Sequence, residues 1–523
     1  MPWPDNLARR SHDPGFLWRV AIGIVAAGFV VSLLVRWLPG ERAGDPMVRA
    51  LLQASSSPQD PWAAVRQMLA EPNLSYYDIL HSAWMIGAVY DPPPPADLFD
   101  TAAGAWGQEA ADVGNELALS IADKEPTPDL RRIAAVRPPV PYANYALALS
   151  LPEATDPQEA YDALRVEGGL PNAEPARQML VDELIANDRW DELTELAGSP
   201  DYRSLIPYYA IASRAAERGD WLTVLRLSPH TLVHRLETGP AVLAGFTGLC
   251  WLAFLLHAGR FREGGVSWLL CIVAVALGAC SIPLTHFFIY YQEYGWGLEA
   301  SNELLPGLKY YILGVGLREE LAKLILMLPV IPVLVYKRSE LQALFVCACV
   351  GLGFAIVENI GYFGGDLGTS SIGRLTTANF MHMSLTGLVG LSVCRACWHP
   401  KSLGPEAVAV FCVAAILHGL YDAFIALPAL STDWDIIGSF IFLAMVFQFF
   451  REFRGANHNQ TYRLSVSFTF TVGVALVTSA TYVYLSSQVG QMMALRLLTM
   501  DLVGSAVMVY LFLREAPESL IDA

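Results

Sequence analysis

Four consecutive apolar stretches of this chain carry acidic, amide and imidazole side chains in a fixed order. In chain order they are Glu319, Glu320 and Lys323; Glu358, Asn359 and Tyr362; His382; and His418 with Asp422. A charged side chain at the centre of a bilayer costs about 2.5–3.5 kcal/mol on insertion scales. Several such residues in neighbouring apolar stretches therefore indicate a functional site.

Two kinds of chemistry are open to these residues, and both activate water. One carboxylate and two imidazoles, for which we nominate Glu358, His382 and His418, can bind zinc and leave a position for water. A further carboxylate then serves as general base. Alternatively, a glutamate in a low-dielectric pocket activates water without a metal, while histidine and asparagine stabilise the oxyanion. The residue types therefore predict hydrolysis, with zinc as the candidate cofactor.

The spacing within each stretch predicts which side chains share a helix face. Glu319 and Lys323 are four residues apart, as are the members of two further pairs. Residues four apart lie on one face of an α-helix. The further pairs are Glu358 with Tyr362 and His418 with Asp422.

The elements that must position these residues are membrane spans. Of the 523 residues, 54% are hydrophobic and 16% are charged, against about 25% charged in ordinary soluble domains. A span needs about 20 apolar residues. We expect ten spans in an all-α polytopic fold, near residues 20–35, 240–258, 266–288, 309–336, 341–363, 376–394, 404–427, 436–450, 463–486 and 491–513.

The positively charged loops predict the orientation of these spans. With the N-terminus in the cytoplasm, Arg260, Lys337, Arg395 and Arg451 all fall in cytoplasmic loops, whereas the opposite loops are nearly free of lysine and arginine. In this arrangement Glu319, Glu358, His382 and His418 all lie in the outer half of the bilayer, although two of their helices run inward and two run outward. This agreement in depth predicts a shared polar cavity open to the outside.

A second, water-exposed region interrupts the apolar pattern. Nearly all of the net charge of −16 lies between residues 39 and 238, and none of the eight cysteines does. Apolar residues recur there at helical spacing, and Trp190 and Trp221 each follow a short polar turn. This pattern suits helix–turn–helix repeats of the tetratricopeptide (TPR) kind, with an irregular helical bundle as the alternative. We therefore expect three parts: an N-terminal tail and anchor at residues 1–38, an acidic extracytoplasmic helical domain at 39–238, and a membrane-embedded domain at 239–514.

The ordered set of motifs resembles the PrsW family, which is related to the CAAX prenyl endopeptidases and similar membrane-embedded proteases. The resemblance covers about Leu304 to Phe424, roughly a quarter of the chain. Its motifs are Glu319-Glu320-x-x-Lys323, Gly353-Phe354-x-x-x-Glu358-Asn359-x-x-Tyr362, His382 and His418-x-x-x-Asp422. The resemblance implies an intramembrane endopeptidase, of either a glutamate or a metalloprotease type, that cleaves membrane-anchored regulators, such as anti-sigma factors, near the outer membrane face.

The same resemblance implies roles for individual residues. Glu319 and Glu320 would be the catalytic pair, and Glu358, His382 and His418 would complete the site. The expected partners are a membrane-anchored protein substrate and the lipid bilayer of the cell membrane, and no nucleic acid. Two other readings of the buried charges remain: a proton- or ion-coupled transporter, which would be expected to show internal repeats, and a non-catalytic membrane scaffold.

Overall fold

In the computed structural model, every regular element of the described residues is helical. The described residues are 5–35, 46–71, 73–152, 157–196, 198–230, 238–431, 435–457 and 464–515. The predicted all-α class is therefore confirmed. The predicted boundary at residues 38–39 lies outside the described residues.

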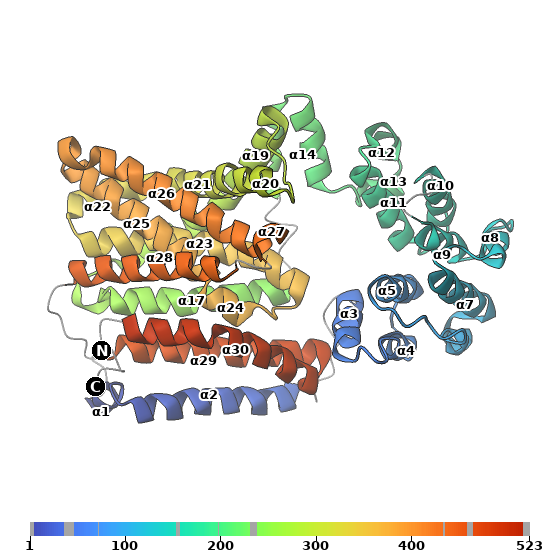
Figure 1. Cartoon of the computed structure of the whole chain (residues 1–523), viewed down its shortest axis with the longest axis horizontal. Helices are drawn as coiled ribbons and strands as arrows, with labels where there is room; N and C mark the ends of the chain where they lie inside the picture. Colours follow the sequence, from blue (N-terminus) through green and yellow to red (C-terminus); the bar gives the residue numbers. More distant parts are fainter. Residues whose placement is uncertain are drawn as a thin grey trace. The chain divides into compact units, whose positions relative to one another are not determined.

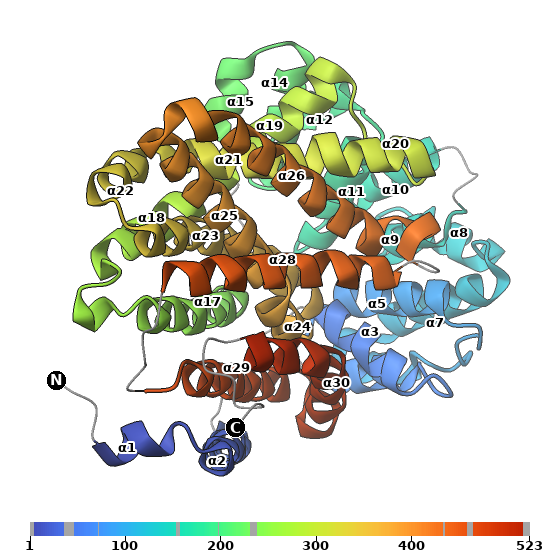
Figure 2. The same ribbon diagram turned by 60° about the vertical axis from the view of Figure 1, so that its left-hand side comes forward.

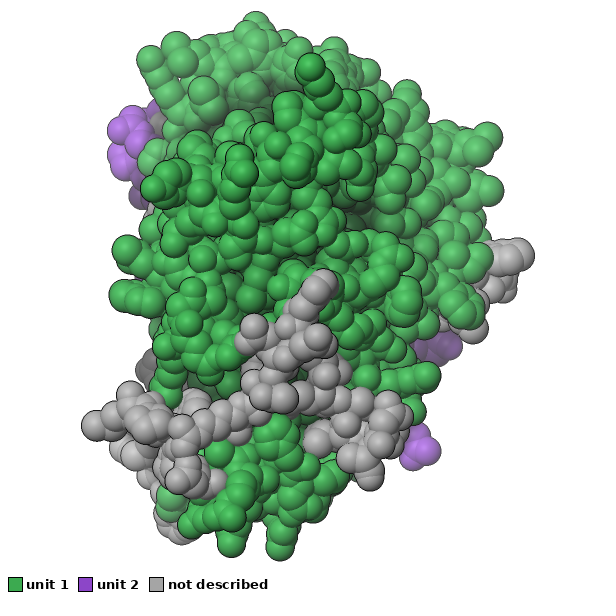
Figure 3. Space-filling view, turned by 90° about the vertical axis from the view of Figure 1, so that its left-hand side faces the viewer, with its two compact units in different colours: residues 1–40, 215–523 green, residues 41–214 purple. Residues whose placement is uncertain are grey.

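The chain divides into two compact units, coloured separately in Figure 3. One, the membrane unit, comprises residues 1–40 and 215–523, and the other, the acidic unit, comprises residues 41–214. Residues 215–238, which the sequence analysis placed in the acidic domain, group with the membrane unit. The reason is local packing: Trp221 at the start of α15 (Trp221–Leu227) stacks edge-on against Tyr291, with ring centroids 5.2 Å apart.

The membrane unit consists mainly of long helices that lie side by side (Figure 1). Among the described residues, eight helices are long and apolar enough to cross a membrane. Their segments are Pro14–Leu34, Thr238–Glu263, Trp268–Gly295, Glu340–Asp366, Ser371–Trp398, Pro400–Ala426, Val466–Val489 and Gln491–Glu515. The chain is thus a multi-pass membrane protein.

The two other predicted spans are also helical but more polar. Residues 304–337 form a continuous helical run, and residues 435–456 form α28. The first run carries Glu319, Glu320 and Lys323, and the second ends in Arg451, Glu452 and Arg454. We therefore keep the total of ten spans as a prediction.

Helices of the membrane unit after residue 237 include, in chain order, α17 (Thr238–Ala258), α18 (Trp268–Ala279), α19 (Ser281–Tyr290), η3 (Tyr291–Gly295), α20 (Leu304–Lys309), η4 (Tyr310–Gly316), α21 (Leu317–Met327), η5 (Leu328–Val330), α22 (Ile331–Lys337), α23 (Glu340–Asp366), α24 (Ser371–Thr376), α25 (Ala378–Trp398), α26 (Pro400–Ala426), α28 (Asp435–Ala456), α29 (Val466–Val489) and α30 (Gln491–Glu515). Helix α2 (Pro14–Val35) packs along α29. Helix α23 is the most buried of the apolar spans and packs against α17, α18 and α25.

Glycines let the site-bearing helices approach closely. A Cβ at Gly351 of α23 would collide with the carbonyl oxygen of His382 on α25, and one at Gly419 of α26 would collide with the backbone of Tyr311 in η4. Gly316 faces the backbone of α26 in the same way. Small residues allow such backbone-to-backbone packing between membrane helices. These contacts bring the four motif-bearing helices together.

The acidic unit is built from short helices around its own apolar core. They are α3 (Pro46–Ser56), α4 (Ala63–Leu69), α5 (Tyr76–Val89), η1 (Asp100–Ala102), α6 (Ala103–Trp106), α7 (Gln108–Asp123), α8 (Pro128–Ala134), α9 (Ala143–Ser150), α10 (Pro157–Gly168), α11 (Glu174–Ala186), α12 (Trp190–Leu196), α13 (Pro200–Arg203) and part of α14 (Tyr208–Glu217). The relation to tetratricopeptide repeats stays a prediction.

A buried carboxylate in this unit links helices α5, α9 and α10 by hydrogen bonds. Glu167 is fully buried and accepts hydrogen bonds from the Tyr77 hydroxyl (2.7 Å) and from the backbone N–H groups of Tyr142 (2.6 Å) and Asn144 (3.2 Å). It thus satisfies amides at the start of α9. Burial raises the pKa of Glu167 above its ordinary value.

Replacing Glu167 by alanine should destabilise the acidic unit by about 3 kcal/mol, because three buried or part-buried donors lose their acceptor. The folded carboxyl holds its proton more tightly than the unfolded chain does, so the advantage of the wild type should narrow as pH rises through the raised pKa. Hydrogen exchange of the α9 amides in the intact protein measures both effects. Unchanged protection of α9 in Glu167→Ala would contradict this role.

Candidate active site

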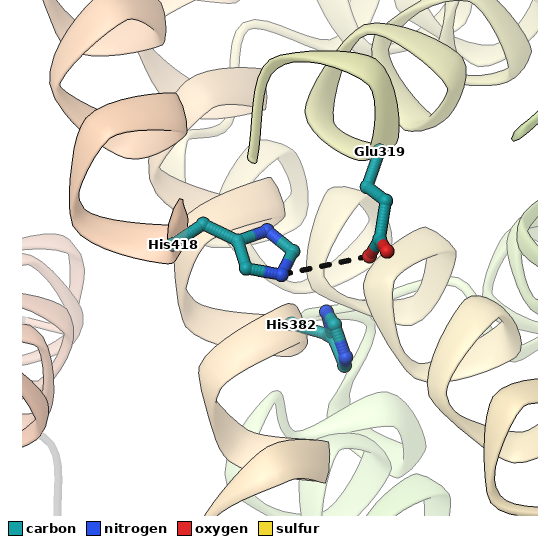
Figure 4. Close-up of side chains that lie close together, drawn as sticks. All are labelled: Glu319, His382 and His418. Carbon is teal, nitrogen blue, oxygen red and sulfur yellow. Dashed lines mark ion pairs between the residues drawn. The ribbon is translucent and has the colours of Figure 1, made fainter. Parts of the chain in front are cut away.

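Three of the predicted site residues form a compact cluster of possible metal ligands. Glu319 extends from α21, His382 from α25 and His418 from α26, and they point toward one another (Figure 4). One ligand atom from each residue can be chosen so that all lie within 4.8 Å of one another, and all three residues are buried. The Nε2 atom of His418 lies 3.5 Å from Oε2 of Glu319. One carboxylate and two imidazoles thus meet at one point.

The cluster differs in one member from the predicted ligand set, because Glu319 stands where Glu358 was expected. Glu358 lies beside the cluster, with its Oε2 atom 3.1 Å from Nε2 of His382 and 2.5 Å from the guanidinium of Arg374. Its carboxylate is therefore already paired with a cation.

Glu320 and Lys323 form the inner support of the cluster. Oε1 of Glu320 lies 2.8 Å from Nδ1 of His418 and 2.8 Å from Nζ of Lys323. A carboxylate only accepts, so His418 donates through Nδ1 and turns its Nε2 toward Glu319. In many proteins a metal-ligating histidine donates its other ring N–H to a carboxylate, and this hydrogen bond fixes the tautomer of the imidazole.

Lys323 is fully buried and connects both glutamates to the other histidine. Its Nζ atom lies 2.8 Å from Nδ1 of His382 and 3.7 Å from Oε2 of Glu319. The ammonium also sits 4.0 Å from the ring centroid of Phe354. Since the ammonium donates to Nδ1, the Nε2–H of His382 donates to Glu358.

The remaining predicted residues are the buried Asn359 and the more exposed Asp422 and Tyr362. Asn359 donates through Nδ2 to Oδ1 of Asn379 (2.6 Å), and Asp422 places Oδ2 3.4 Å from Nε2 of His418. Tyr362 is half exposed, and its ring lies 3.5 Å from the guanidinium carbon of Arg374. The structure therefore brings all nine predicted residues into one connected region.

Arg374 is a site residue that sequence reasoning missed. It received no role in the sequence analysis, yet its guanidinium donates to Glu358 and, through Nε, to Oδ1 of Asn359 (2.5 Å). The signal that could have found it is its isolation: it is the one arginine in an outer loop region that is otherwise almost free of positive charge.

A divalent metal fits this site on two observations. Oε2 of Glu319 is buried and accepts no hydrogen bond. An oxygen that binds a cation is expected to have this free lone pair. The four carboxylates of Glu319, Glu320, Glu358 and Asp422 face two permanent cations, Lys323 and Arg374. The carboxylates thus exceed the permanent cations by two negative charges, which one bound divalent cation would balance. Binding of an ion by His382 requires one of its nitrogens to exchange its present partner for that ion.

The local backbone of the first motif is unusual. A π-helix, η4, runs directly into α21, which carries Glu319 and Glu320 two and three residues after its start. π-Helical turns are rare and occur frequently at functional sites. The wide turn adjusts the rotation of α21 before the two glutamates.

Comparison with known proteins identifies a family that the site-bearing region matches. No curated protein and no solved structure matches the chain. Residues 266–450 match the family model described as the PrsW family intramembrane metalloprotease, and this range includes all four helices of the site. Residues 266–450 are thus an intramembrane protease region of the PrsW family, and the chain that carries them is a membrane-embedded peptidase.

Proposed function

We propose that this protein is an endopeptidase that cleaves membrane-anchored protein substrates near the extracytoplasmic face, with a metal site formed by Glu319, His382 and His418. The observation that carries the proposal is the meeting of these three buried side chains from three helices. We further propose that the N-terminus is cytoplasmic and that the substrates resemble anti-sigma factors, being regulators with a membrane anchor.

The three residues would hold zinc or a similar divalent ion, which when bound lowers the pKa of water to about 7 and polarises the scissile carbonyl. Glu320 keeps the Nδ1 proton of His418 in place, so that Nε2 is free to face the ion. Arg374 holds the Glu358 carboxylate beside His382. Each of these residues orients another and needs no substrate contact.

Asp422 is the candidate general base. Its side chain is 28% exposed, more than any other carboxylate of the site, and it lies within reach of the same His418 nitrogen as Glu319. In this scheme the Asp422 carboxylate takes a proton from the attacking water as the water oxygen bonds to the peptide carbon. It then gives that proton to the amine nitrogen as the C–N bond breaks.

Removal of divalent metal should abolish cleavage by the purified protein. A single-span model substrate and the protein are reconstituted in liposomes, treated with a chelator, and then supplied with zinc. We expect product formation to fall by at least about 10³-fold and to return with zinc, because the ion supplies several kcal/mol of transition-state stabilisation.

A metal-depleted protein that cleaves as fast as the untreated one would favour the metal-free glutamate mechanism. Proton flux through the liposomes with no cleavage of any single-span substrate would instead favour the transporter reading.

A further inference from the structure

The short helix α24 carries the arginine that completes the site, and it cannot hold that arginine by itself. It has six residues, Ser371–Thr376, between the long helices α23 and α25. Isolated helices of this length are unstable, because nucleation costs more than a few hydrogen bonds return. The position of Arg374 must therefore be fixed by neighbours of α24.

Helix α30 contacts α24 through two hydrogen bonds to the Asp501 carboxylate. The carboxylate accepts from the backbone N–H of Ile372 (2.8 Å, Oδ2) and of Gly373 (2.9 Å, Oδ1). Both amides lie in the first turn of α24, where N–H groups have no helical partner and the dipole favours an anion. Gly373 leaves the room for this approach, since a Cβ there would lie 2.9 Å from Oδ1.

Two more helices hold α24 from other sides. The hydroxyls of Ser371 and Thr481 on α29 are 2.7 Å apart and buried. The indole of Trp251 on α17 donates to the carbonyl of Leu375 (2.7 Å). In both Figure 1 and Figure 2, α24 lies beside α30. The contacts from α17, α29 and α30 all come from outside residues 266–450.

A continuous set of contacts links Asp501 to His382, one of the proposed metal ligands. Asp501 holds the backbone of α24, Arg374 of α24 holds Glu358, and Glu358 accepts from His382. Charge-assisted hydrogen bonds are about twice as strong as neutral ones, and more so where water is excluded. Catalytic groups need placement to within about 0.5 Å, so a shift of α24 changes the site.

We propose that Asp501 is a positioning residue for the peptidase: it fixes α24 so that Arg374 holds Glu358 against His382. This inference rests on the proposed function. It also gives the two C-terminal spans a role that the matched family region does not supply.

Replacing Asp501 by alanine should lower kcat by about 10–100-fold, the usual effect of losing an outer partner of a metal ligand. Asp501→Asn should have a smaller effect, because the amide oxygen still accepts from one N–H. Thr499→Ala, at an exposed position of the same helix, is the matched control and should behave like the wild type.

A double-mutant cycle separates positioning from general loss of stability. If Asp501 acts through Arg374, then Asp501→Ala should cause no further loss of kcat in an Arg374→Ala background. Two effects that simply multiply would overturn the proposal, as would unchanged kcat in Asp501→Ala.

Hydrogen exchange tests the inference without any cleavage. The Ile372 and Gly373 amides should exchange at least tenfold faster in Asp501→Ala than in Thr499→Ala, whereas the α25 amides should not change. Unaltered exchange at these two amides would overturn the inference even if activity fell. A wild type that binds metal and shows no peptidase activity would instead count against the proposed function alone.

Discussion

His418→Ala is expected to lower the rate of substrate cleavage by at least about 10³-fold, a loss of about 4 kcal/mol of transition-state stabilisation. His418 contacts three carboxylates of the site. Its Nδ1 donates to Glu320, and its Nε2 faces both Glu319 and Asp422. Its removal takes away a proposed metal ligand and the group that connects three carboxylates. Bound zinc, measured by elemental analysis of the purified protein, should fall together with the cleavage rate.

The matched control for this variant is His286→Ala. His286 lies on α19 in the same membrane unit, is partly buried, and contacts the carbonyl of Ile282 (3.1 Å). It is not part of the cluster, so its variant should retain zinc and cleave at the wild-type rate. Full zinc content and normal cleavage in His418→Ala would show that the ligand assignment is wrong.

Lys323→Met is expected to destabilise the membrane unit by about 3–5 kcal/mol. Lys323 is fully buried, and its ammonium is the cation shared by Glu319 and Glu320. Breaking a buried ion pair by removing one partner leaves an uncompensated charge in a low-dielectric interior, which costs about this much. Methionine keeps most of the volume, so a cavity contributes little. The measurement is the free energy of unfolding in detergent, or the melting temperature where unfolding is irreversible.

A second substitution distinguishes this charge effect from a packing effect. Glu320→Gln alone also loses an ion pair, but Lys323→Met together with Glu320→Gln leaves no unpaired charge at Glu320. The double variant should therefore be more stable than Lys323→Met. A double variant that is less stable by the sum of both single effects would indicate that the pair does not interact.

The helical periodicity of the first motif illustrates what sequence spacing can and cannot decide. Spacing placed Lys323 on the face of Glu319, four residues away. In the structure the ammonium lies closer to Glu320 (2.8 Å) than to Glu319 (3.7 Å), because a residue three positions away is equally within reach on a helix. The choice between the two glutamates depends on where His382 and His418 stand, and those histidines belong to other helices.

The residue types and their order determined the all-α membrane fold and the set of helices that carry the site. Apolar stretches long enough to span a bilayer must be helical there, since lipid satisfies no backbone polar group. Buried ionisable residues in four such stretches must face one another, because lipid solvates none of them. For these reasons the candidate residues could be named from the sequence.

Only the tertiary structure decided which of those residues meet at one point. The rotation and depth of each helix depend on the contacts at Gly316, Gly351 and Gly419 and on the π-helix before α21. These contacts place Glu319, and not Glu358, with the two histidines. The helix that carries Arg374 is likewise contacted by Asp501, more than a hundred residues away in sequence. Such long-range contacts leave no periodic signal in a single sequence, because they arise from packing between helices and not from the pattern within one.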